Sequence, residues 1–224
     1  MKKHILTIVT IVLITFSVKS QSCSAFYPFE EGATFTITSY SKKDKVVGIS
    51  EYRVSEVSSN SATMTTKLKD KNGEVLSDGS YKINCNGDGI SMDVESLLNP
   101  QLFEQFKDFE TDISGTGVVL PNNLSVGQEL PDATMSMKIN MGGINMNMDV
   151  MMTDRKVVGK EKVTTPAGTF DCYVITYTSD IKMGMNRKGT AKQWIAKGVG
   201  MVKQEDYNKK GKVTSSSLLT AYSK

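Results

Sequence analysis

The dominant pattern in this chain is an alternation of apolar and polar residues with a period of two. It begins where Ala33, Phe35 and Ile37 alternate with threonines, and it returns in the runs Val46 to Val57 and Ala62 to Lys69. A period of two places successive side chains on opposite faces of a β-strand. The pattern therefore restricts the chain to a fold built mainly from half-buried strands.

Turn residues separate these runs at short intervals. Ser41 to Asp44 and Ser58 to Ser61 are polar, Asn72-Gly73 is a strong hairpin signal, and a second glycine-rich turn spans Asn86 to Gly89. Strands joined by such short turns pair as antiparallel neighbours. We therefore expect an all-β fold, an antiparallel meander.

One segment breaks the alternation. Apolar residues from Val94 to Phe106 recur at intervals of three and four, with Pro100 among them, which is typical of an amphipathic helix. We expect one short helical insert near residues 95–108, after which strands resume around Phe109. A loop at Pro121 to Pro131 and further hairpins complete the chain.

Residues Thr134 to Met152 form a methionine-rich hairpin centred on Gly142-Gly143. Both glycines accept a positive φ, as a two-residue hairpin turn requires. Folding the chain at this turn places four cross-strand pairs on one face. These pairs are Met141–Ile144, Ile139–Met146, Met137–Met148 and Met135–Val150, and Ile181, Met183 and Met185 extend the pattern on a later strand.

Three interpretations of this methionine face compete. It packs on the core, it lines a cavity or groove for an apolar ligand, or its thioethers bind a soft metal such as Cu(I). Trp194, the only tryptophan, is either a core anchor beside a turn or a stacking surface for a ligand. The ligand-binding interpretation predicts these contact residues: Met135, Met137, Ile139, Met146, Met148, Val150, Met183, Met185 and Trp194.

The first twenty residues have the composition of a secretory signal peptide. Lys2 and Lys3 precede an apolar run from Ile5 to Val18, and Val18-Lys19-Ser20 suits a cleavage site. The run is shorter than the roughly 20 residues that a membrane-spanning helix needs. We expect residues 1–20 to form a cleaved signal helix and residues 21–224 to form a single β-rich domain.

Loss of this leader removes several classes of chemistry. His4 is the only histidine, so the mature chain has no Ser-His-Asp or Cys-His catalysis and no His-ligated metal site. The formal charge of +3 falls to about zero without Lys2, Lys3 and Lys19, which argues against nucleic-acid binding. No spacing marks a catalytic carboxylate pair. We expect a protein that is not an enzyme and has no cofactor or metal.

The three cysteines leave one residue unpaired. Export permits disulfides, and Cys85 ends an expected strand beside a glycine turn, where Cys23 can reach it. Cys23 is alternatively a lipid attachment site. Against this, the preceding Ser20-Gln21-Ser22 lacks the Leu-like and Ala or Gly residues that usually come before a lipidated cysteine. Cys172 lies among apolar residues and is expected to be buried. We favour a Cys23–Cys85 disulfide.

Four segments carry a family resemblance: VTTPAGTFDC at 163–172, WIAKGVGMVK at 194–203, PNNLSVGQEL at 121–130 and CSAFYPFEEG at 23–32. They resemble the TapB-like exported proteins, which are related to a domain-of-unknown-function family of periplasmic β-proteins. The resemblance implies a strongly curved sheet or open half-barrel of the kind seen in lipoprotein carriers. It supplies no catalytic residues.

These features lead to one preferred function and two alternatives. The preferred function is an exported, non-catalytic protein of the periplasm or cell surface, or one associated with the outer membrane, that binds a lipid chain or lipidated partner on a methionine-lined concave sheet. The alternatives are a structural or assembly protein of the envelope, with protein partners and no small ligand, and a Cu(I) carrier.

Overall fold

The computed structural model describes residues 23–94 and 108–224. These residues form thirteen strands: β1 (Thr34–Ser41), β2 (Val46–Val57), β3 (Ser61–Lys69), β4 (Val75–Cys85), β5 (Gly89–Met92), β6 (Glu110–Gly115), β7 (Val118–Pro121), β8 (Ala133–Met141), β9 (Ile144–Thr165), β10 (Gly168–Met183), β11 (Met185–Ala196), β12 (Gly200–Asn208) and β13 (Val213–Ser223). The expected strands before residue 90 are confirmed. The expected signal helix and the expected helical insert fall on residues 1–22 and 95–107, outside the described part.

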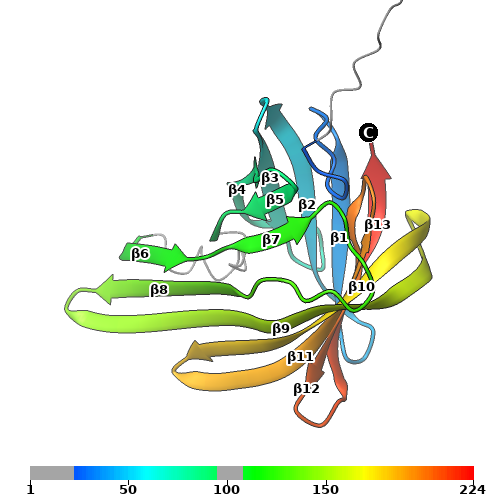
Figure 1. Cartoon of the computed structure of the whole chain (residues 1–224). Coiled ribbons are helices and arrows are strands. Elements are labelled where there is room, and N and C mark those ends of the chain that lie inside the picture. The colour runs from blue at the N-terminus through cyan, green and yellow to red at the C-terminus, as the bar shows by residue number, and fades with distance from the viewer. Residues whose placement is uncertain (1–22, 95–107) are drawn as a thin grey trace, which may run out of the picture.

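All thirteen strands belong to one antiparallel sheet. Its order is β6-β8-β9-β10-β11-β12-β13-β1-β2-β3-β4-β5-β7, so the first and last strands of the chain are neighbours and β6 and β7 form the edges. Figure 1 shows the sheet curving strongly, with the long β8–β9 hairpin crossing below β7. The expected all-β curved sheet is confirmed. In the part of the chain that the structure describes, no helix has the length and apolar character needed to cross a membrane.

The curvature is concentrated at irregularities in the strands. In β9, which is 22 residues long, Asp154 and Arg155 lie opposite the single residue Tyr177 of β10. Asp154 has a φ of 55°, a conformation that Asp tolerates better than most residues. Such a β-bulge bends the strand and resets which residues face each side of the sheet. A second register shift follows between Val174 and Ile175 of β10.

The connection between β7 and β8 bridges the open side of the sheet. Its backbone pairs with β9, where the Gly127 N–H donates to the Val157 carbonyl at 2.7 Å and the Leu130 N–H donates to the Arg155 carbonyl at 2.8 Å. The connection therefore satisfies backbone groups beside the bulge and links the two ends of the sheet, as Figure 1 shows.

The N-terminal segment is fastened across the main core. Cys23 and Cys85 form a disulfide with a Cα–Cα distance of 5.5 Å, which is the pair favoured from the sequence. The Asn122 amide accepts from the Ala25 N–H at 2.6 Å and donates to the Cys23 carbonyl at 3.1 Å. Phe26 is fully buried and packs edge-on against Tyr173. The sulfur of Cys23 cannot carry a lipid while it forms this disulfide.

The buried apolar residues form two separate clusters. The main core gathers side chains from the N-terminal segment, the central strands and the β7–β8 connection. The methionine cluster consists of Met135, Met137, Ile139, Met148 and Val150, with Val94, Ile113, Met141, Met146 and Met183 packed against it. The hairpin pairs expected around Gly142-Gly143 are confirmed, and the φ angles of the two glycines are 63° and 101°.

We predict that the disulfide makes a large contribution to stability. It closes a loop with a sequence separation of 62, for which the chain-entropy model gives about 4 kcal/mol. The double variant Cys23→Ala/Cys85→Ala should lose about this much free energy of unfolding in a urea titration. Dithiothreitol should destabilise the wild type by a similar amount and leave the double variant unchanged. A loss below about 1 kcal/mol would show that the loop is held by other contacts.

Candidate functional site

The concave side of the sheet holds a cavity of about 280 Å³. Its apolar wall includes Phe35, Ile37, Leu120 and Ile195, together with Met92, Met152 and Met201. Its polar groups come from Tyr27, Tyr52, Tyr81, Arg155, Tyr177, Gln193 and Gln204. Among the described residues that line it there is no Asp or Glu. The cavity thus combines a largely apolar wall with a concentration of hydrogen-bond donors.

Strand alternation positions most of the aromatic residues of the wall. Phe35 of β1 lies opposite Tyr52 of β2, and their rings stack at a centroid distance of 4.7 Å. Tyr81 of β4 lies opposite Met64 of β3, which in turn lies opposite Val54 of β2. Val54 is two residues from Tyr52, so Tyr81 projects from the same side of the sheet as Tyr52. Tyr27 reaches the cavity from the N-terminal segment instead. The disulfide and the sheet therefore act together to build the site.

Arg155 is a buried cation, and only part of its guanidinium is hydrogen-bonded. Its side chain lines the cavity, and the residue is only 3% exposed. One nitrogen, Nη1, donates to the Val119 carbonyl at 3.2 Å and to the Pro131 carbonyl at 2.6 Å. Nε has no hydrogen-bond partner. Desolvation lowers the pKa of the guanidinium, but an arginine stays protonated in proteins, so the charge persists.

The tyrosine hydroxyls of the cavity are protonated donors. Burial raises the pKa of Tyr27, Tyr52, Tyr81 and Tyr177 above the ordinary value of tyrosine. Within the described residues, the hydroxyls of Tyr27, Tyr81 and Tyr177 form no hydrogen bond, and none of these oxygens is among the fully buried unsatisfied atoms. The cavity therefore presents donors that the chain itself leaves free.

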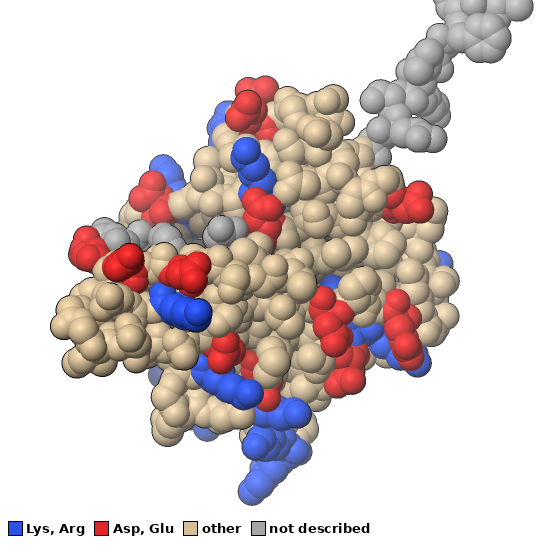
Figure 2. Space-filling view, turned by 60° about the vertical axis from the view of Figure 1, so that its left-hand side comes forward, with Lys and Arg blue, Asp and Glu red and all other residues tan. Residues whose placement is uncertain are grey.

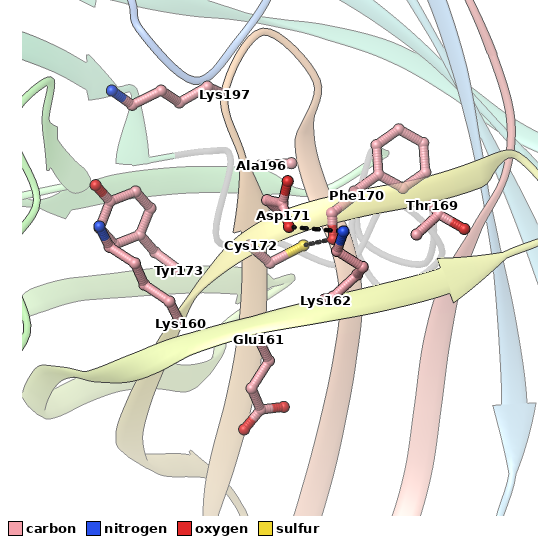
Figure 3. A pocket seen from close by; sticks show the side chains of 10 residues that line it. All are labelled: Lys160, Glu161, Lys162, Thr169, Phe170, Asp171, Cys172, Tyr173, Ala196 and Lys197. Atoms are coloured by element: carbon pink, nitrogen blue, oxygen red, sulfur yellow. Dashed lines mark hydrogen bonds and ion pairs between the residues drawn. The ribbon is translucent and has the colours of Figure 1, made fainter.

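A second pocket, of about 590 Å³, lies at the β9–β10 hairpin. Figure 3 shows its side chains spread along the two strands, with Lys197 approaching from the turn after β11. Lys162 pairs with Asp171 at 3.7 Å. The Cys172 thiol points at the Phe170 carbonyl, and burial raises its pKa to about 11. A thiol in this state is a poor nucleophile, so the pocket does not assemble an activated cysteine site.

The surface charges are intermixed rather than segregated. Figure 2 shows a face on which Lys and Arg side chains alternate with Asp and Glu over large uncharged areas. Several of the charges form ion pairs, among them Lys69–Glu51 at 2.6 Å and Lys203–Glu205 at 2.7 Å. Such a face lacks the single-sign field that steers polyanions. The expectation of no nucleic-acid partner stays a prediction.

The nine contact residues predicted from the sequence lie away from the concave cavity. Met135, Met137, Ile139, Met148 and Val150 are buried in the methionine cluster, and Met146 and Met183 are half-buried against it. Met185 is 73% exposed. None of the nine lines the cavity. Their role in ligand binding, and the thioether metal site, stay predictions. In the described segments, no group of three His, Cys, Asp or Glu residues could hold a metal ion.

Trp194 lies on the face opposite the cavity, because its neighbours Gln193 and Ile195 line the cavity. It is 3% exposed, and its Nε1–H donates to Glu161 Oε2 at 2.7 Å. The ammonium groups of Lys192 and Lys203 each lie 4.6 Å from its ring centroid. The ring is therefore covered by its own chain, as expected for an anchor rather than for an open stacking surface.

The polar residues of the cavity could not be predicted from the sequence, for a physical reason. From Met148, Val150 and Met152, a period of two would place residue 154 inward and Arg155 outward. The bulge at Asp154 reverses this order. Tyr52, Tyr81 and Tyr177 lie in strands and Tyr27 precedes the first strand. No local sequence pattern shows that these four residues converge on one cavity.

We predict that the contact between Glu161 and Trp194 makes stability depend on acid pH. Hydrogen bonds from Trp194 and then Lys192 hold the pKa of Glu161 below its usual value. A depressed folded-state pKa contributes stability above the unfolded pKa of about 4.3, and this contribution disappears as pH falls through the lower folded value. The advantage of the wild type over Glu161→Gln in unfolding free energy should be constant above about pH 6 and shrink below about pH 4.

Trp194 fluorescence can follow this unfolding, since the chain has one tryptophan. Glu129→Gln is a matched control, because the Glu129 side chain is 84% exposed and lies 3.6 Å from Lys156. The control should show no such pH dependence. An identical pH profile for both variants would contradict the prediction.

Comparisons with known proteins agree with this architecture. A solved structure from Bacteroides fragilis NCTC 9343, named as an exported protein with a YmcC-like fold, matches 90% of this chain and all of its own, with a TM-score of 0.74 and 26% identity. A Parabacteroides distasonis ATCC 8503 structure, named as a lipoprotein, matches 91% of this chain and all of its own, with a TM-score of 0.74 and 24% identity. Among curated proteins, none matches the chain.

The family comparison places the chain in the broader group expected from its motifs. The narrower resemblance to TapB-like proteins stays a prediction. The match extends over residues 30–219, from the N-terminal segment to β13, and thus covers almost the whole curved sheet. On this evidence the chain belongs to the DUF3108-like family.

Proposed function

We propose that this chain is an exported, non-catalytic binding protein that holds a ligand with an apolar body in its concave cavity. The observation that carries this proposal is the cavity of about 280 Å³ with an aromatic and aliphatic wall. Ligand sites are usually preformed concave pockets with mainly apolar walls and a few polar groups that fix orientation. The wall here rests on paired strands and on an N-terminal segment fastened by a disulfide.

Three features support export to the periplasm or cell surface. The first twenty residues have the features of a secretory leader. The Cys23–Cys85 disulfide suits an oxidising compartment. The Bacteroides fragilis relative is named as an exported protein. The ligand of an envelope protein with such a cavity is a lipid chain or another apolar molecule, delivered free or on a lipidated partner.

The concave cavity is a better site than the methionine face. Met135, Met137 and Met148 are at most 1% exposed, so a ligand would have to displace side chains that already pack together. In the concave cavity, a ligand can contact the wall residues without displacing packed side chains. Soft thioethers still contribute, because Met92, Met152 and Met201 belong to its wall.

The same burial favours a second candidate function. A methionine face that is filled by its own chain is what a structural or assembly protein of the envelope would have, with a protein partner and no small ligand. The two functions differ in a measurable way, because only the first requires the concave cavity to accept a molecule.

We predict that the purified protein binds the neutral apolar dye N-phenyl-1-naphthylamine, with an increase in dye fluorescence. Met152→Trp adds volume inside the cavity and should weaken dye binding by about tenfold or more. Met137→Leu conserves volume in the methionine cluster and should leave dye binding unchanged. Native mass spectrometry of protein isolated from its source should show a co-purified apolar molecule.

Two outcomes would contradict this function. Absence of both dye binding and any co-purified molecule would favour the structural alternative. If dye binding were weakened in Met137→Leu and unchanged in Met152→Trp, the ligand would be assigned to the methionine face instead. Melting curves followed by far-ultraviolet circular dichroism show whether each variant is folded.

We also predict that export removes the leader and leaves the disulfide in place. Amino-terminal sequencing of the exported protein should begin at Gln21 or within a residue or two of it. Cys23 should resist alkylation until the protein is unfolded and reduced, because its sulfur is bonded to Cys85. A lipid on Cys23 would refute the disulfide and place the protein on a membrane.

A further inference from the structure

The concave cavity contains a positive charge that the protein does not neutralise. Arg155 is 3% exposed and lines the cavity, and its Nη1 bonds only to two backbone carbonyls. In the described ranges, no Asp or Glu lies within ion-pair distance of it, although its charge senses Asp132 at longer range. A buried charge without a counter-ion is unfavourable unless a partner supplies the opposite charge.

The surrounding groups are donors. Tyr27, Tyr81 and Tyr177 line the same cavity, and their hydroxyls form no hydrogen bond with another described residue. Nε of Arg155 is buried and also lacks one. The carbonyl of Gln204 is already engaged by the Gln193 amide at 3.2 Å. A carboxylate or phosphate offers these donors several acceptor oxygens and an opposite charge, whereas a cation offers neither.

We propose that the concave cavity binds the anionic head of an amphipathic molecule, a carboxylate or a phosphate on an alkyl chain, and that Arg155 is the anion-binding residue. Tyr27, Tyr81 and Tyr177 donate further hydrogen bonds to the head. The aliphatic and aromatic wall holds the chain. This inference rests on the proposed binding function and adds the chemical class of the ligand.

A purely structural role for Arg155 does not account for its charge. The two carbonyl bonds of Nη1 link β7 to the segment that enters β8, which stabilises the open side of the sheet. A neutral amide could donate to the same two carbonyls. The guanidinium carries further donors in a fixed planar fork that matches the geometry of carboxylates and phosphates.

The test compares three ligands that share one alkyl chain: decanoate, decyl phosphate and decan-1-ol. Titration calorimetry of the full mature chain at pH 8, below the micelle concentrations, gives an affinity for each. For the wild type, at least one of the two anions should bind about tenfold or more tightly than the alcohol. The stronger of the two anions identifies the head group. In Arg155→Gln this preference should fall to about onefold, with binding of the alcohol retained.

A second variant keeps the test decisive if Arg155→Gln fails to fold. Tyr27→Phe/Tyr81→Phe removes two hydroxyls and leaves the carbonyl bonds of Arg155 intact. It should reduce the preference for the anion by about threefold to tenfold. Tyr40→Phe is a matched control outside the cavity wall and should change nothing. Trp194 fluorescence reports the fold of each variant.

The outcomes separate the inference from the function on which it rests. Equal affinities of the wild type for all three ligands would overturn the inference and leave the proposed function intact. Binding of none of the three would contradict both. An unchanged preference for the anion in both Arg155→Gln and the tyrosine double variant would overturn the role of these residues.

Discussion

The β-bulge at Asp154 and Arg155 is the constraint on which the two halves of the concave face depend. Before it, β9 turns Met148 and Val150 into the methionine cluster; after it, the same strand turns Arg155 and Val157 inward. A strand without the bulge would send a cation to the solvent and an aspartate into the apolar interior. The bulge thus places the positive charge and bends the strand in one step.

The cavity is rigid because its walls are held from several directions. Backbone pairing fixes the strands, the β7–β8 connection bonds to β9 beside Arg155, and the disulfide holds the segment that carries Tyr27. A preformed pocket spends little binding free energy on ordering its own side chains. The cost of this rigidity is an uncompensated charge and several free hydroxyls, which a ligand or ordered water can satisfy.

Much of the local structure followed from the sequence alone. The run Val46 to Val57 matches β2 at both ends, and Gly142-Gly143 fixes every pair of the methionine hairpin. These two predictions were correct because side-chain alternation and turn geometry are set by neighbouring residues. The predicted contact residues of the ligand did not fall on the cavity, because the methionine face packs into a cluster of its own.

The sequence by itself determined the all-β class, the hairpin registers and the residues able to form a disulfide. Only the tertiary structure decided that Cys23 meets Cys85, that β1 pairs with β13, and that four tyrosines converge with Arg155 on one cavity. The physical reason is that a period of two holds only between irregularities. Each bulge resets the inward face, and its position is decided by how the strand pairs with its neighbour and packs in the sheet, which local alternation does not show.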